Sequence, residues 1–322
     1  MTGRAVVAAG LAILLGAATA RATGGKADRA GGGWFDLGSR LGQVGQITVD
    51  FPIYEPQSVI AQIQKLERNP LIKGMILRVD SPGGDVGAVQ EIVEELEKFR
   101  DGGKVRRPIV ASFGGVAASG GYYIACTADR IFSNAGTLTG SIGVIIEFPV
   151  AEELMKKVGV KYVVIKSGRY KDTGNFARSM SPEELAMMQH TVDDVYEQFV
   201  SAVWKGRAGA VRAATARDRG RAGAKVTDRE ALAFLRDICD GRVMSGRQAL
   251  ARGLVDSLGG RDDARAELGR LCGLGRDPHV ILPPRRRDTG FAWTDLLGGM
   301  LGLPAPAGLV GRNRPSLEYL LR

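Results

Sequence analysis

Two short apolar runs in this chain each end in a pair of glycines, and a helix-like stretch follows each pair. Residues 73–79 lead into Gly83-Gly84, and residues 108–113 lead into Gly114-Gly115. After the first pair, apolar side chains recur every three or four positions, which predicts an amphipathic helix. Strands that alternate with helices predict an α/β fold with a mainly parallel sheet flanked by helices. Ligands of such sheets bind at the carboxyl ends of the strands, where both glycine pairs fall.

The same criteria predict further elements along the chain. We expect strands over residues 44–49, 130–133 and 161–165 and helices over residues 56–68, 117–128 and 228–238. Ser181-Pro182-Glu183-Glu184 predicts the start of a long helix, because it combines a capping serine, a proline at the first position and an acidic first turn.

The amino-terminal residues have the composition of a targeting segment. Arg4 precedes an apolar run over residues 5–20, which is short for a membrane span but longer than the apolar region of most signal peptides. Ala18-Thr19-Ala20 also fits a signal-peptidase cleavage site. We therefore interpret residues 1–21 as either a cleaved signal peptide or a retained signal anchor.

The rest of the chain divides by composition into three parts. Residues 22–42 are glycine-rich and predict a flexible tether, and residues 43–271 hold the predicted folded domain. Within that domain, residues 206–225 are rich in Ala, Gly and Arg and have few large apolar side chains, so we expect an exposed insertion there. Residues 272–322 form a C-terminal tail that is rich in proline and glycine toward its end.

The overall charge and the cysteines exclude several classes of protein. The formal net charge is +9, but the arginine-rich runs contain no interleaved aromatic residues, so we expect no nucleic-acid partner. The three cysteines form no CxxC pair and have no histidine at metal-binding spacing. This pattern argues against a disulfide framework and against a structural zinc site, and we expect no metal or organic cofactor.

Ser119 is the candidate nucleophile. It lies between small residues, in Ala118-Ser119-Gly120-Gly121, where a predicted strand gives way to a predicted helix. There its hydroxyl can be presented without obstruction, near the positive end of the helix. The alternative is a serine that only caps the helix, and the local sequence leaves both interpretations open.

A nucleophilic serine needs a base, and the chain offers only two histidines, His190 and His279. Neither lies in a segment that indicates catalysis. A lysine can replace histidine if burial and neighbouring charges leave a neutral amine available. Lys171 is the candidate, because it follows a predicted strand in a glycine-containing turn; the alternative for this lysine is an ordinary exposed charge.

Glycine-rich turns could supply the donors that an acyl intermediate requires. Backbone amides of Gly83, Gly84 and Gly120 can approach a substrate carbonyl closely, because no Cβ intrudes. A turn imposed by Pro82-Gly83 alone is the alternative. In residues 137–144, hydroxyls and glycines alternate with aliphatic side chains, which could hold Ser141 toward a buried amine or form an ordinary kinked strand.

Taken together, these segments resemble the bacterial signal peptide peptidase family, in its short, single-domain form. The similarity covers roughly residues 44–265 and rests on the order of its motifs: Asp80-Ser81-Pro82-Gly83-Gly84, Ala118 to Tyr123, Thr137 to Gly143, Lys166-Ser167-Gly168 with Lys171-Asp172, Asp240 to Val243, and Gly253 to Asp256.

The resemblance implies a crotonase-like or Clp-protease-like fold and a serine endopeptidase with a Ser–Lys dyad. Ser119 would be the nucleophile, Lys171 the base and Ser141 the group that orients the lysine amine, with oxyanion donors at Gly83, Gly84 and Gly120. It also implies homo-oligomers at the extracytoplasmic (periplasmic) face of the cell membrane. Their substrates would be remnant signal peptides and other small hydrophobic peptides.

Two other functions stay open at this stage. Acyl-CoA hydratases and isomerases share the expected fold and also hold an oxyanion with paired glycine amides, but they need no Ser–Lys pair. A membrane-associated scaffold of the same fold with an inactive site is the non-enzymatic alternative. Loss of hydrolysis in Ser119→Ala separates a peptidase from both.

Overall fold

The central sheet is built from parallel strands, as the sequence predicts. The computed structural model describes residues 42–220 and 222–283, and the backbone of residues 318–320. The described residues form an eight-stranded sheet in the order β7-β6-β4-β2-β1-β9, with β5 joining β4 to β8, and only the β6–β7 pair is antiparallel. Its strands are β1 (Gln43–Val49), β2 (Ile72–Ser81), β4 (Ile109–Ala118), β5 (Arg130–Ser133), β6 (Leu138–Gly140), β7 (Val243–Ser245), β8 (Ser257–Leu258) and β9 (Val280–Ile281).

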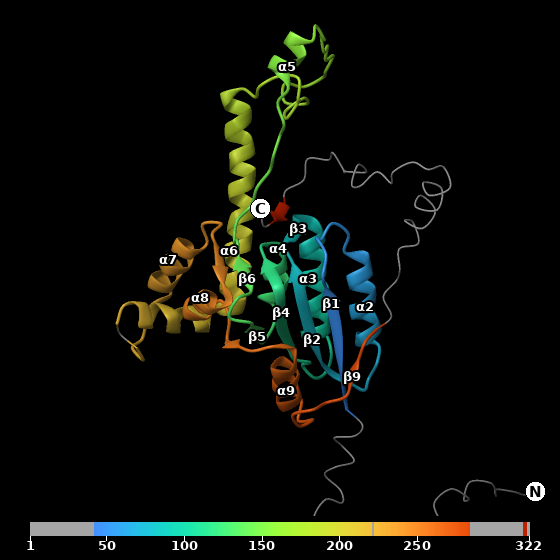
Figure 1. Cartoon of the computed structure of the whole chain (residues 1–322), viewed down its shortest axis with the longest axis vertical. Coiled ribbons are helices and arrows are strands. Elements are labelled where there is room, and N and C mark those ends of the chain that lie inside the picture. The colour runs from blue at the N-terminus through green and yellow to red at the C-terminus, as the bar shows by residue number, and fades with distance from the viewer. Residues whose placement is uncertain (1–41, 221, 284–317, 321–322) are drawn as a thin grey trace, which may run out of the picture. The chain divides into compact units, whose positions relative to one another are not determined.

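Helices cover both faces of this sheet. Because side chains alternate along a strand, Leu77 of β2 faces the larger apolar core, and its neighbour Ile76 faces a smaller one with Leu268 of α9. The larger core includes α2 (Gln57–Glu67), α3 (Val86–Asp101) and α4 (Gly120–Ala125), which Figure 1 shows side by side. The smaller core lies beneath α9 (Arg261–Leu271). These layers confirm the predicted α/β class.

The long helix α6 (Pro182–Asp218) begins at the predicted capping serine but extends further than expected. The exposed insertion predicted over residues 206–225 is wrong for residues 206–218, which form the last turns of α6. Arg207 is only 3% exposed and donates a 2.8 Å hydrogen bond to Asp256, and Val211 is fully buried. Arg207 can be buried because the carboxylate of Asp256, which is distant in the sequence, neutralises its charge. The alanines of this segment can be buried because their small side chains pack closely.

The segment between β6 and α6, residues 144–181, is called the arm below. It carries the short helix α5 (Glu152–Lys157), and Figure 1 shows the arm reaching the amino-terminal end of α6. The strand predicted over residues 161–165 is wrong: this stretch forms no strand, and Ile165 is 97% exposed. Its β-branched residues have the composition of a strand, but the described chain provides no strand for them to pair with.

The first glycine pair, Gly83-Gly84, belongs to a second, two-stranded sheet. β3 (Gly83–Asp85) pairs antiparallel with β10 (Glu318–Leu320), with Gly84 opposite Tyr319. The folded part also runs past residue 271, the predicted end of the domain, because Val280 of β9 pairs with Val44 of β1. The remaining helices are α7 (Asp228–Ile238) and α8 (Gly246–Ala251).

The predicted export signal (residues 1–21) and all but the last residue of the tether (residues 22–42) lie outside the described residues, as does most of the tail. Within the part of the chain that the structure describes, no helix is both long and apolar enough to cross a membrane.

Candidate active site

Ser119 stands at a sharp turn between β4 and α4. Its backbone has φ 53° and ψ −120°, in the left-handed half of conformational space that side chains rarely adopt. Ser141 (φ 49°) is the other described residue, apart from glycines, with positive φ. Such strain costs roughly 1–3 kcal/mol and persists where the surrounding structure enforces it, commonly at functional sites. A serine at a strained strand-to-helix turn is also the arrangement that exposes the nucleophile of α/β-hydrolases.

The hydroxyl of Ser119 does not cap the helix that it precedes. Ser181 and Ser245 accept a hydrogen bond from the third residue of their helices, at 3.3 Å each, but Ser119 makes no such bond. Among the described residues, its Oγ is the one buried side-chain oxygen or nitrogen without a hydrogen-bond partner. An unpaired buried hydroxyl costs about 1–3 kcal/mol. The capping interpretation of Ser119 is therefore wrong.

The pairing of β4 with β6 brings the second strained serine to the same edge of the sheet. Ala118 lies opposite Gly140, and the amide of Ser119 donates to the Gly140 carbonyl at 2.9 Å. The next residue, Ser141, is 8% exposed, and its amide donates to the carbonyl of Arg242 at 2.8 Å. Backbone bonds thus fix both serines at adjacent strand ends.

The Gly83-Gly84 turn lies beside the start of α4. Gly83 has φ 109°, and a Cβ on Gly84 would lie 2.1 Å from the Ile53 carbonyl oxygen, so both positions require glycine. A Cβ on Gly121 would lie 2.7 Å from the Ser81 carbonyl oxygen, so α4 packs directly on this turn. The amide of Gly83 already donates to the Ser81 hydroxyl at 3.2 Å. Of the three predicted oxyanion donors, Gly83 thus already makes a hydrogen bond within its own turn.

Lys171 does not join these residues within one chain. It is exposed, in a turn of the arm, and Ser119 Oγ has no hydrogen-bond partner. The side-chain bonds of this turn run to the amino-terminal end of α6 instead, through Asp172 and Arg178. Both histidines, His190 and His279, are exposed as well, so neither replaces Lys171 as a buried base near Ser119.

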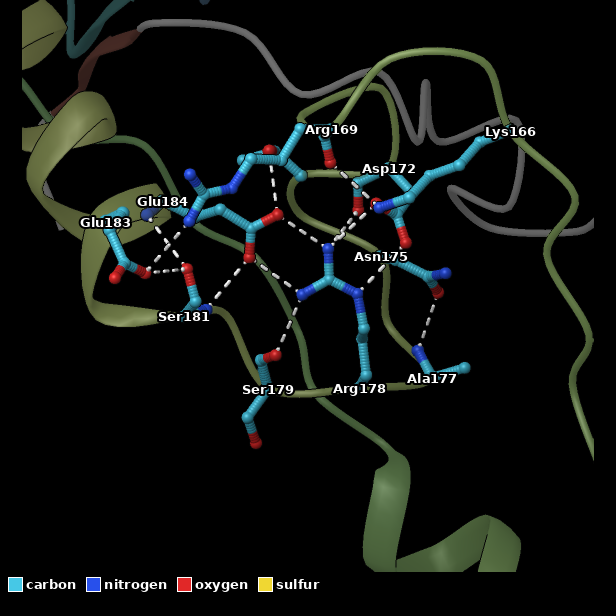
Figure 2. Close-up of polar contacts among 11 residues, drawn as sticks. Lys166, Arg169, Asp172, Asn175, Ala177, Arg178, Ser179, Ser181, Glu183 and Glu184 are labelled. Atoms are coloured by element: carbon cyan, nitrogen blue, oxygen red, sulfur yellow. Dashed lines mark hydrogen bonds and ion pairs between the residues drawn. The ribbon is translucent and has the colours of Figure 1, made fainter.

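A charged cluster surrounds the turn that carries Lys171 (Figure 2). Arg178 donates to Asp172 at 2.9 and 3.0 Å and to Glu184 at 2.6 and 2.7 Å. These bonds from Arg178 lower the pKa of Asp172 far below its usual value and lower that of Glu184 to about 2. Arg178 was not predicted from the sequence, because it lies six residues from each carboxylate in an irregular segment, where no helix or strand relates the three side chains.

An apolar groove of about 580 Å³ lies between the arm and α6. Its lining is mainly aliphatic and aromatic: Val144, Ile145, Ile146, Phe148, Val150, Met180, Leu185, Met188 and Val192, with Glu147, Ser179 and Gln189 as its polar members. Among the described residues, no group of three or more His, Cys, Asp or Glu side chains is arranged to hold a metal ion.

Comparison with known proteins places these features in a family. Residues 102–223 match the model of peptidase family S49, and residues 29–136 match that of Clp protease. "Putative protease MJ0651" of Methanocaldococcus jannaschii is 30% identical over 241 residues, which are 74% of this chain and 69% of that protein. The chain belongs to peptidase family S49. The predicted family and the Clp-protease-like fold are confirmed, and at the level of the family so is the predicted enzyme class, a serine peptidase.

Two further relatives extend the match within family S49. The chain is 43% identical over 203 residues, 63% of its length, to "Putative protease slr0021" of Synechocystis sp.. It is 36% identical over 239 residues, 74% of its length, to "Putative signal peptide peptidase SppA" of Enterococcus faecium. The matched regions are 64% and 62% of those two proteins, so the chain spans less than two thirds of each.

Proposed function

We propose that this chain is an active serine endopeptidase in which Ser119 is the nucleophile and Lys171 the general base. The observation that carries the proposal is the Ser119 hydroxyl itself, strained, 1% exposed and without a hydrogen-bond partner. A fold retains such an unfavourable group where it has a task that a relaxed, hydrogen-bonded serine could not perform.

A second copy of the chain would supply the lysine. The arm holds Lys171 away from the Ser119 of its own chain, and it exposes many apolar side chains, among them Val163 (81% exposed) and Ile165. Exposed apolar surface of this extent is typical of a protein interface. Packing the arm against a neighbouring copy would cover this surface and bring an amine into a neighbour's site, so the proposal includes a homo-oligomer.

The chemistry follows from these positions. Neutral Lys171 Nζ takes the proton of Ser119 Oγ as the oxygen attacks a peptide carbonyl carbon. The amides of Gly84 and Gly120 would hold the resulting oxyanion, and Ser141 would orient the amine. The ammonium then returns the proton to the leaving amine as the C–N bond breaks. Water, deprotonated by the same amine, releases the acyl group from Ser119.

The proposed substrates are hydrophobic peptides, including remnant signal peptides. The apolar lining of the groove between the arm and α6 supports this choice. The pairing of β10 with β3 supports an extended substrate, because the strand beside the oxyanion glycines already accepts a peptide backbone in antiparallel register. No metal or organic cofactor enters these steps.

We also place the protein at the extracytoplasmic face of the cell membrane. The support is the apolar run over residues 5–20, which fits either a cleaved or a retained export signal, and the apolar surface of the arm. Membership in family S49 disfavours the acyl-CoA hydratase alternative. An inactive scaffold remains the competing function, and activity measurements decide between the two.

The test is hydrolysis of a hydrophobic fluorogenic peptide by wild type, Ser119→Ala and Lys171→Ala. Each variant alone should lose at least about a thousandfold in kcat, because the two groups act as a unit. Co-expressed variants should regain part of the activity, since one chain keeps the serine and another the lysine. Full activity in either variant alone would refute the dyad, and an inactive mixture would refute its assembly between copies.

A further inference from the structure

Arg178 joins a turn of the arm, which precedes it in sequence, to the first turn of α6, which follows it. Its guanidinium makes a bidentate contact with Asp172, in the turn that carries Lys171, and a second bidentate contact with Glu184, in the first turn of α6 (Figure 2). Paired bonds between a planar guanidinium and a carboxylate fix orientation as well as distance. The Arg178 side chain therefore fixes the turn relative to the helix.

The helix end of this contact is itself rigid. Glu184 is the third residue of α6 and accepts a 2.9 Å bond from the amide of Ser181, and the Ser181 hydroxyl accepts from the amide of Glu184. Thr173, two residues after Lys171, donates to Glu184 at 3.1 Å. The turn with Lys171 is thus fastened to the capped end of a 37-residue helix whose other half lies in the protein core.

The charge of Asp172 also bears on the neighbouring lysine. A free carboxylate beside Lys171 would favour the ammonium form, which cannot act as a base. Two cations, Arg178 and Lys166, contact the Asp172 carboxylate. The charged groups of the turn and of the elements packed on it are Lys166, Arg169, Asp172, Arg178, Glu183 and Glu184, with Glu152 of α5 at the Ser179 end.

We propose that Arg178 is a positioning residue for catalysis: by clamping Asp172 to Glu184, it fixes the turn that presents Lys171 and compensates the carboxylate next to it. This inference rests on the proposed dyad of Ser119 and Lys171. It assigns no contact with substrate to Arg178, which acts only through the turn and its charge.

The test uses three variants: Arg178→Gln, Asp172→Asn and the double variant. Each is measured for kcat, KM and the pH dependence of kcat/KM on a hydrophobic peptide. Arg178→Gln should lower kcat by roughly 10- to 100-fold with little change in KM, as expected for a displaced catalytic group. Thermal unfolding of each variant shows whether the domain remains folded.

The pH profiles separate an electrostatic role from a purely structural one. Removing the Arg178 cation favours the lysine ammonium, so the acid side of the profile should move to higher pH. Removing the Asp172 anion has the opposite effect and should move it to lower pH, each by about half a pH unit or more. The double variant should return close to the wild-type position while its kcat stays low. A merely destabilised arm would not produce opposite shifts.

Arg169→Gln is the matched control. It removes the same charge from a position close to Lys171 in sequence, but Arg169 is 69% exposed and its ion pair with Glu183 is 3.9 Å long. Its kcat should stay within about twofold of wild type, since long exposed pairs contribute little. Wild-type kcat and pH profile in Arg178→Gln, with Ser119→Ala and Lys171→Ala inactive, would overturn the role of Arg178 and leave the dyad intact. Activity in the latter two would remove the proposed function instead.

Discussion

Arg207 in α6 and Asp256 in the turn before β8 form an ion pair of 2.8 Å whose cation is 3% exposed and whose anion is 14% exposed. Arg207 also donates to the Gly253 carbonyl at 3.2 Å, and Asp256 accepts from the amide of Ile131 at 2.8 Å. This pair joins the long helix to the sheet that carries Ser119. It thereby fixes the sheet beneath the site relative to the helix from which the arm departs.

Arg207→Ala should destabilise the domain by about 1–3 kcal/mol, because the Gly253 carbonyl loses its donor and Asp256 is left with the longer contact to Arg130, at 3.6 Å. The measurement is the free energy of unfolding in urea. Arg212→Ala is the control, since Arg212 pairs with Asp228 at the protein surface, and it should leave the unfolding midpoint unchanged. Equal losses of unfolding free energy in the two variants would show that the Arg207–Asp256 pair stabilises the domain no more than the surface pair does.

Ser119→Gly should stabilise the protein while abolishing its activity. Glycine accepts φ 53° without strain and removes the unpaired hydroxyl, and these gains exceed the entropy cost of glycine by about 1 kcal/mol. Ser181→Ala is the comparison: its free energy of unfolding should fall by about 1 kcal/mol, because it loses the helix cap. The free energies of unfolding of the two variants are measured side by side. A destabilised Ser119→Gly would show that the Ser119 hydroxyl has a structural role.

Acid should loosen the arm only well below neutral pH. The pKa of Glu184 is lowered from 4.5 to about 2 by its bonds to Arg178 and Ser181, so its contribution to stability is present above about pH 4.5 and is lost as pH falls toward 2. Acid unfolding of the wild type, followed by near-ultraviolet absorption, should therefore show a transition in this range. In Glu184→Gln the arm should lose that pH dependence; an unchanged acid transition there would contradict this account.

Deleting residues 318–322 should raise activity toward short peptides. β10 pairs with β3 along the edge that an extended substrate would use, so the tail reduces the fraction of sites that are free. If the strand occupies most sites, its removal should lower KM roughly 3- to 10-fold and leave kcat unchanged. Steady-state kinetics on a substrate of about six residues is the measurement. An unchanged or higher KM would show that β10 does not compete with substrate.

Local signals in the sequence were sufficient for much of the fold. Ser181-Pro182 marked the start of α6, and the apolar run at residues 44–49 became β1, because capping and strand periodicity are properties of neighbouring residues. The glycine pair at Gly83-Gly84 marked the site edge for the same reason. The strand predicted at residues 161–165 failed because pairing depends on a partner that no local pattern reveals.

The remaining errors and omissions involve contacts between distant residues. Arg207 is buried because it pairs with Asp256. That partner lies 49 positions away in the sequence, so the arginine-rich segment around Arg207 was predicted to be exposed. Arg178 binds one carboxylate on either side of it in an irregular segment, where no helical or strand pattern marks the contact. The separation of Lys171 from Ser119 within one chain could not be predicted either, since the order of motifs in a sequence does not fix the distances between them in space.

The claim on which the account rests is that Ser119 is a nucleophile activated by Lys171. Intact-mass analysis after treatment with a serine-reactive phosphonate probe tests it most directly. The wild type should gain one adduct per chain, at Ser119, whereas Ser119→Ala and Lys171→Ala should gain none. An adduct of equal yield in Ser119→Ala, or labelling of wild type at a different residue, would contradict the account.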